Sequence, residues 1–130
     1  MKLLSWNIQW GRGADGEVSL ARTVAAIRLL GDFDVICLQE VAVGFPAMQG
    51  GARVDALAFF AQAFPAYSAH FAAAVDMPGA DAARSLFGNL ILSRLPVGQV
   101  FPQQSSEEGI SDWGLDDATD RSWALSIPNP

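Results

Sequence analysis

The stretch Asp34-Val35-Ile36-Cys37-Leu38-Gln39-Glu40 decides the fold of this chain. Its four consecutive apolar residues, bounded by polar ones, predict a short strand over residues 34–39 that is covered on both faces. Strands of this kind lie inside sheets that carry helices, so the stretch favours an α/β fold over an all-helical or all-β one.

The residues before this strand complete a strand–helix–strand unit. Apolar residues in 2–9 predict a first strand, and helical spacing of apolar residues predicts a helix over 19–30. Ser19 is placed to cap the start of this helix, and Gly31 follows its end. A unit of this kind normally has a right-handed crossover and parallel strands that are neighbours or near neighbours.

The rest of the chain continues the α/β pattern as a single domain over residues 1–130. We predict a second helix over 54–64 and strands over 67–75, 86–93, 97–101 and 121–127. The three glycines in residues 10–16 predict a mobile surface loop after the first strand. Residues 103–120 contain six acidic residues and no lysine or arginine, which predicts a solvated acidic loop.

Composition narrows the class of protein. Hydrophobic residues make up 51% of the chain and charged residues 17%, which is ample material for a packed core. The net charge of −6 weighs against a nucleic-acid substrate, because such binders usually carry a basic patch. The single cysteine, Cys37, excludes an internal disulfide. The start of the chain does not resemble a signal peptide and no apolar run is long enough to span a bilayer, so we expect a soluble, cytoplasmic protein.

Two polar side chains stand at or near the carboxyl ends of the first two predicted strands. Asn7 belongs to the first strand and Glu40 follows the second. Ligands of open α/β sheets bind at this edge, so the two side chains would share one crevice if the strands are parallel neighbours. Amide and carboxylate oxygens suit Mg²⁺ or Mn²⁺ better than zinc. These residues alone also fit a turn-forming asparagine and a solvated glutamate, which is the commoner arrangement.

Three motifs in order resemble the endonuclease/exonuclease/phosphatase superfamily, specifically its amino-terminal half. They are Trp6-Asn7-Ile8, the stretch 34–40, and Gly88-Asn89-Leu90-Ile91-Leu92-Ser93-Arg94-Leu95-Pro96-Val97. The resemblance implies part of a four-layer α/β sandwich of the DNase I-like kind, in which helices flank a mixed sheet. It also implies a divalent-metal-dependent phosphoester hydrolase, that is, a phosphodiesterase, a phosphatase or a nuclease.

The resemblance further implies roles for individual residues. Glu40 would ligate Mg²⁺ or Mn²⁺, and Asn7 would help to hold the metal or the phosphate, so both are the expected catalytic residues. Gln39 would orient the ligand rather than bind it. Asn89 and Arg94 are candidates for substrate binding, although a backbone-bonded Asn89 and an exposed Arg94 that closes a strand are ordinary alternatives. The substrate would be a phosphoester in a small molecule, a lipid headgroup or a nucleic acid.

The sequence departs from the family in its second half. It contains no Gly-Asp-x-Asn segment and no Ser-Asp-His motif, which would supply the base and the histidine. His70, the one histidine, comes too early and is expected to be structural, and Ser111-Asp112 matches the terminal motif only by coincidence. We therefore expect a fragment that is inactive alone and that self-associates through an uncovered sheet face. A non-catalytic binding or interaction module and an unrelated α/β domain are the alternatives.

Overall fold

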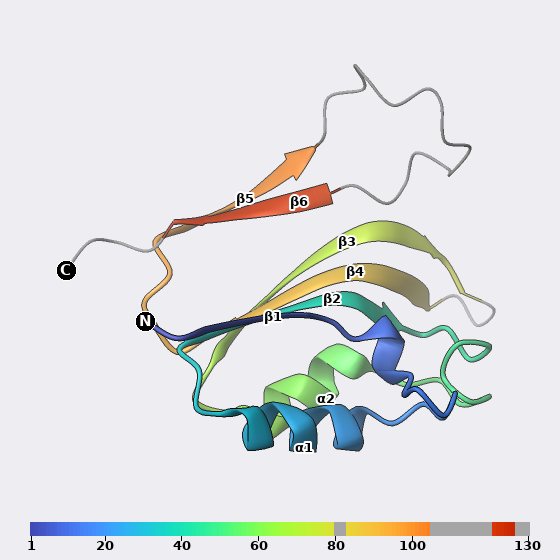
Figure 1. The fold of residues 1–130 in the computed structure, drawn as a ribbon. Coiled ribbons are helices and arrows are strands. Elements are labelled where there is room, and N and C mark those ends of the chain that lie inside the picture. Colours follow the sequence, from blue (N-terminus) through green and yellow to red (C-terminus); the bar gives the residue numbers. More distant parts are fainter. Residues whose placement is uncertain (80–82, 105–120, 127–130) are drawn as a thin grey trace, which may run out of the picture.

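A computed structural model describes residues 1–79, 83–104 and 121–126 of the chain, with the backbone alone for 101–104 and 121–126. Figure 1 shows a sheet with two helices on one face and a separate two-stranded hairpin on the other. The elements in chain order are β1 Leu3–Asn7, the 3₁₀ helix η1 Gln9–Gly11, α1 Leu20–Leu30, β2 Val35–Val43, α2 Ala56–Ala63, β3 Ser68–Pro78, β4 Arg84–Ser93, β5 Gln99–Gln104 and β6 Arg121–Ser126.

The main sheet has the strand order β1-β2-β4-β3. β1 and β2 are parallel, and their register runs from Leu3 opposite Val35 to Asn7 opposite Gln39. β4 is antiparallel to both β2 and β3. The predicted strand–helix–strand unit with adjacent parallel strands is therefore confirmed, within a mixed α/β sheet.

Both helices begin where a short polar side chain caps them. The Ser19 hydroxyl accepts the N–H of Arg22 at 3.2 Å, and the Asp55 carboxylate accepts the N–H of Ala58 at 3.0 Å. These bonds satisfy amide groups that have no partner inside the helix. The helices then bury their apolar sides against the sheet, in a core made by Ile8, Leu20, Val24, Ile27, Ile36, Leu38, Val41, Ala56, Phe60, Phe64, Leu90 and Leu92.

The opposite face of the sheet is more polar at the β1 edge. Leu4 and Trp6 pack against the core, whereas Leu3, Ser5 and Asn7 alternate with them and are exposed. The β5–β6 hairpin lies on this side of the sheet (Figure 1), with β6 close to β3. Asn7 therefore projects from the face that the helices leave open.

Several predicted boundaries are wrong. β2 continues to Val43 instead of ending at Gln39, β3 extends to Pro78, and β4 starts at Arg84. Pairing with β4 carries β2 past the polar Gln39–Glu40 and β3 past Val75. Pairing with β3 extends β4 back to Arg84. The predicted acidic loop 103–120 begins inside β5, and its residues 105–120, including Ser111-Asp112, lie outside the described residues.

Hydrogen bonds from Arg22 hold the glycine-rich segment after β1, and its predicted mobility stays a prediction. The Arg22 guanidinium makes two bonds to the Asp15 carboxylate, at 2.7 and 3.0 Å, and a third to the Glu17 carbonyl. A Cβ at Gly13 would lie 2.2 Å from the Arg22 guanidinium, so a side chain there would displace the guanidinium from Asp15. In the part of the chain that the structure describes, no helix has the length and apolarity to cross a membrane.

Candidate active site at the carboxyl ends of the parallel strands

Asn7 and Glu40 meet at the carboxyl end of β1. The Asn7 side-chain amide donates a hydrogen bond of 2.8 Å to Glu40 Oε1. The parallel register brings them together, because Asn7 is paired with Gln39, the residue before Glu40. A carboxylate and an amide from distant segments thus form one polar group at the edge where α/β sheets bind ligands.

The orientation of the Asn7 side chain follows from its two partners. Its Oδ1 accepts the backbone N–H of Gln9 at 3.0 Å, while its Nδ2 faces the Glu40 carboxylate. The first partner can only donate and an ionised carboxylate can only accept, so the amide has one satisfactory orientation. Asn7 therefore holds the Glu40 side chain and the start of η1 at the same time.

Glu40 reaches the open face because β2 contains a bulge. Leu38 is paired with Leu90 and Val41 with Gly88, so Gln39 and Glu40 together face a single residue of β4. Ile36, Leu38 and Val41 all lie in the core beneath the sheet. Strict alternation from Leu38 would have turned Glu40 into that core, and the extra residue lets Val41 take the buried place.

The backbone is strained around this contact. Glu40 has a φ of 57°, and Gln9 and Trp10 have φ values of 45° and 49°. Within the described residues these three are the only non-glycine residues with positive φ, and all lie just beyond the level at which the pairing of β1 with β2 ends. Such conformations cost roughly 1–3 kcal/mol each and cluster at functional sites.

Gln39 supports the same edge on the open face. Its side-chain amide donates to the Ser5 hydroxyl at 3.3 Å and to the Cys37 carbonyl at 3.1 Å, so it links β2 to β1 on the open face. Burial raises the pKa of the Cys37 thiol, in keeping with a partly buried cysteine. The Gln39 side chain therefore bonds to β1 and to its own strand, and not to the Glu40 side chain.

Asn89 is the β4 residue that faces the bulge. It stands between Leu90, opposite Leu38, and Gly88, opposite Val41, and on its other side it is paired with Ala72 of β3. The three motif residues Asn7, Glu40 and Asn89 therefore come from three adjacent strands at one level of the sheet.

The comparisons with known proteins identify the family of the chain. The family model described as "Endonuclease/Exonuclease/phosphatase family" matches residues 4–127. This chain belongs to the endonuclease/exonuclease/phosphatase family. The crystal structure of an endonuclease/exonuclease/phosphatase from Beutenbergia cavernae is similar, with a TM-score of 0.56 and 29% identity over 78% of this chain. The chain spans 28% of the length of that protein. Among curated proteins no match is found.

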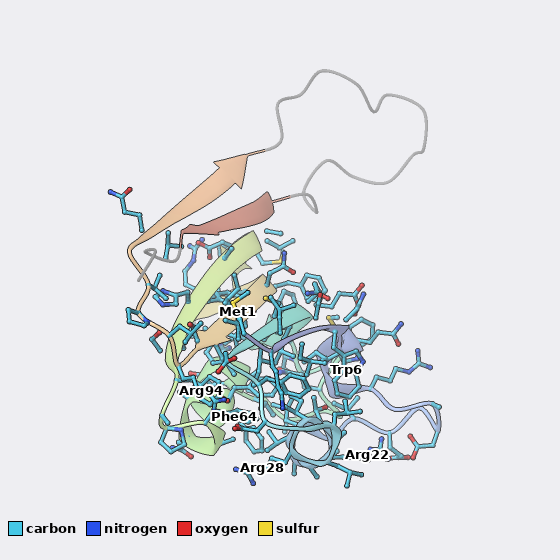
Figure 2. All side chains as sticks on the ribbon, turned by 60° about the vertical axis from the view of Figure 1, so that its left-hand side comes forward. Met1, Trp6, Arg22, Arg28, Phe64 and Arg94 are labelled. Atoms are coloured by element: carbon cyan, nitrogen blue, oxygen red, sulfur yellow. The ribbon has the colours of Figure 1, made fainter. Side chains whose placement is uncertain are left out.

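Arg94 does not lie at the Asn7–Glu40 contact. Arg94 follows β4 beside the start of β2, at the other end of the sheet. Its guanidinium bonds to the Asp32 carboxylate at 2.8 Å and to the Asp34 carboxylate at 3.0 Å. Figure 2 shows Arg94 at the same end of the molecule as Met1, whose amino group lies 4.0 Å from Asp34.

This cluster perturbs Asp34. The backbone N–H of Lys2 and the Arg94 guanidinium hold the pKa of the Asp34 carboxyl below its ordinary value of 3.8. Its two oxygens accept from Lys2 at 2.6 Å and from Arg94 at 3.0 Å. The group ties together the starts of β1 and β2 and the end of β4.

His70 also lies away from the candidate site. Its Nε2 is 3.2 Å from the Ser68 hydroxyl, which donates to the Ser93 carbonyl. A hollow of about 460 Å³ beside His70 and Arg94 and another of about 400 Å³ between Arg28 and Tyr67 both lie at this end of the sheet. Neither touches Asn7 or Glu40.

Members of this family generally use a divalent cation. The residues at the Glu40 edge fit such a cation in part. The described residues contain no group of three His, Cys, Asp or Glu side chains able to hold a metal ion together. Mg²⁺ is commonly held by one or two carboxylates and keeps several waters, so the single Glu40 carboxylate is consistent with it.

The sequence pattern did not reveal the bulge that makes this site. One signal for it existed: the apolar residues that pack in or against the core fall at 36, 38, 41 and 43, with one step of three among steps of two. A step of three in a strand indicates an inserted residue. The continuous apolar run 35–38 masks this signal, because it has no alternation of its own.

Proposed function

We propose that this chain provides the metal-binding carboxylate of a divalent-metal-dependent phosphoester hydrolase. The observation that supports the proposal is the contact between Asn7 and Glu40, in which a strained bulge turns Glu40 onto the open face. A positive φ costs free energy for a residue with a side chain, and the residue that adopts it here is the one whose carboxylate lies on the open face.

In this proposal Glu40 is the ligand and Asn7 positions it. Asn7 Nδ2 engages Glu40 Oε1, which leaves Oε2 for Mg²⁺ or Mn²⁺, and Asn7 Oδ1 is already bonded to Gln9. A bound cation would neutralise charge on the phosphoryl oxygens and make an attacking water more acidic. Asn89, opposite the bulge, is the candidate for contact with the substrate phosphate.

The remaining chemistry needs groups that this sequence lacks. Phosphoester hydrolysis requires an aligned water, a base and charge neutralisation. The Gly-Asp-x-Asn and Ser-Asp-His motifs implied by the family resemblance are absent from the 130 residues. We therefore propose that these residues alone bind a cation weakly and turn over substrate poorly or not at all.

The charge of the chain bears on its substrate. A net charge of −6 favours a small phosphoester or a lipid headgroup over a nucleic acid. Arg94, an early candidate for substrate binding, is engaged by two carboxylates at the other end of the sheet and has no part in the proposed reaction.

Calorimetric titration of Mg²⁺ and Mn²⁺ into the chain tests the proposal. We expect binding in the wild type, its loss in Glu40→Ala, and its retention in Glu17→Ala, which removes an exposed glutamate from the neighbouring loop. Equal binding by wild type and Glu40→Ala would exclude Glu40 as the ligand. Absence of binding in all three would favour a non-catalytic interaction module that retains the scaffold.

A further inference from the structure

Both neighbours of β4 gain an extra residue at the same level of the sheet. On the β2 side, Gln39 and Glu40 together face Asn89. On the β3 side, Ala73 is paired with Gly88 and Val75 with Phe87, so Ala74 is the extra residue. The dipeptide Gly88-Asn89 is thus the point of β4 at which the registers of both adjoining strands shift.

Gly88 is buried and lies in close contact with β3. A Cβ built on Gly88 would lie 1.8 Å from the carbonyl oxygen of Ala72 and 3.0 Å from Cα of Ala73. Both atoms belong to the backbone, so no side-chain rotation could relieve the overlap. Gly88 is not among the glycines with positive φ, and the requirement for glycine here is therefore one of space.

Both bulges face β4, so a change in β4 affects the pairing on both of its sides. A side chain at Gly88 would push β3 and β4 apart at Ala72. β4 is paired with β2 at the same level through Val41, the first residue after the bulge. Movement of β4 at Gly88 therefore reaches the bulge that turns Glu40 towards Asn7, because a bulge changes the local bend and twist of its strand.

We infer that Gly88 is a positioning residue for Glu40. Because Gly88 has no side chain, the Ala72 carbonyl can lie close to β4. This close approach maintains the register in which β2 carries an extra residue at Gln39–Glu40. The inference rests on the proposed function only for its effect on cation binding, since the effect on the Glu40 backbone can be measured without a cation.

The test is Gly88→Ala, read by nuclear magnetic resonance and by cation titration. Positive φ brings the amide and α protons of a residue close together, so Glu40 gives a strong contact between them in the wild type. We expect Gly88→Ala to lose this contact and the Asn7–Glu40 hydrogen bond, and to bind Mn²⁺ about 10- to 100-fold more weakly. Gly31→Ala is the control, because it strains the backbone at a φ of 151° where α1 ends, away from β4.

Deletion of Ala74 provides a second, independent variant in case Gly88→Ala does not fold. It removes the extra residue of β3 while Gly88 stays, and we expect it also to abolish the positive-φ signal of Glu40. A folded Gly88→Ala, or a folded deletion variant, that retains this signal would overturn the inference. The variants could lose the Glu40 signal while the wild type binds no cation. That result would support the role of Gly88 in positioning Glu40 and would contradict the proposed function.

Discussion

Asn7 Nδ2 lies 2.8 Å from Glu40 Oε1, although 33 residues separate them in the sequence. The parallel pairing of β1 and β2 accounts for the proximity of the two residues, and the bulge in β2 accounts for the face on which they meet. The contact is exposed, so a ligand could reach it from solvent.

Loss of the Asn7 side chain should weaken cation binding without unfolding the protein. Asn7→Ala removes the donor that orients Glu40, and residues that orient metal ligands typically contribute 10- to 100-fold, so we expect roughly that loss of Mn²⁺ affinity. Leu3→Ala, at an exposed position on the same side of β1, is the matched control. Calorimetry measures both, and equal affinities would remove Asn7 from the site.

Replacement of Glu40 by glycine should stabilise the fold relative to replacement by alanine. A positive φ costs an L-residue about 1–2 kcal/mol and costs glycine almost nothing, so Glu40→Gly should be more stable than Glu40→Ala by about 1 kcal/mol. Urea denaturation measures the difference. At the preceding strand residue the order should reverse, with Gln39→Ala more stable than Gln39→Gly. If alanine were more stable than glycine at both positions, φ at Glu40 would be negative in solution.

Acid should weaken the end of the sheet that Arg94 holds. The folded pKa of Asp34 lies below the ordinary 3.8, so its stabilising contribution is complete above that pH and is lost as pH falls through the lower folded value. Asp34→Asn should abolish this part of the pH dependence. Urea denaturation between about pH 6 and about pH 2.5 measures it, and parallel profiles for the two proteins would argue against the depressed pKa.

Gln49 should be important for stability despite its polar side chain. It is buried, and its amide bonds to the Ala42 and Val54 carbonyls at 2.9 and 3.2 Å and to the Phe45 N–H at 3.0 Å. Gln49→Ala removes these bonds and leaves the Phe45 N–H without its acceptor, which costs about 1–3 kcal/mol, whereas the Val54 carbonyl still accepts the Gly44 N–H. Gln62→Ala, at an exposed position of α2, should change the free energy of unfolding by less than about 0.5 kcal/mol. Similar values for the two variants would contradict the prediction.

The order and type of the elements were accessible from local patterns. Ser19 and Gly31 bound α1 as predicted, because capping acts within one turn of the helix. The length of β2 was not accessible, because pairing with β4 carries the strand across the polar Gln39–Glu40 and on to Val43. Arg94 shows the same limit: its motif indicated a place near the substrate, whereas its partners Asp32 and Asp34 are some 60 residues away in the chain.

The sequence alone therefore determined the α/β class, the parallel strand–helix–strand unit and the family, since periodicity, caps and motifs are local properties. It also predicted that Asn7 and Glu40 would lie close together if the first two strands were parallel neighbours, which the register of β1 and β2 confirms. Only the tertiary structure decided which way Glu40 faces, which end of the sheet Arg94 occupies, and why residue 88 is glycine. Each of these depends on the register of β4 against two strands, which is fixed by packing across the sheet and not by any one segment.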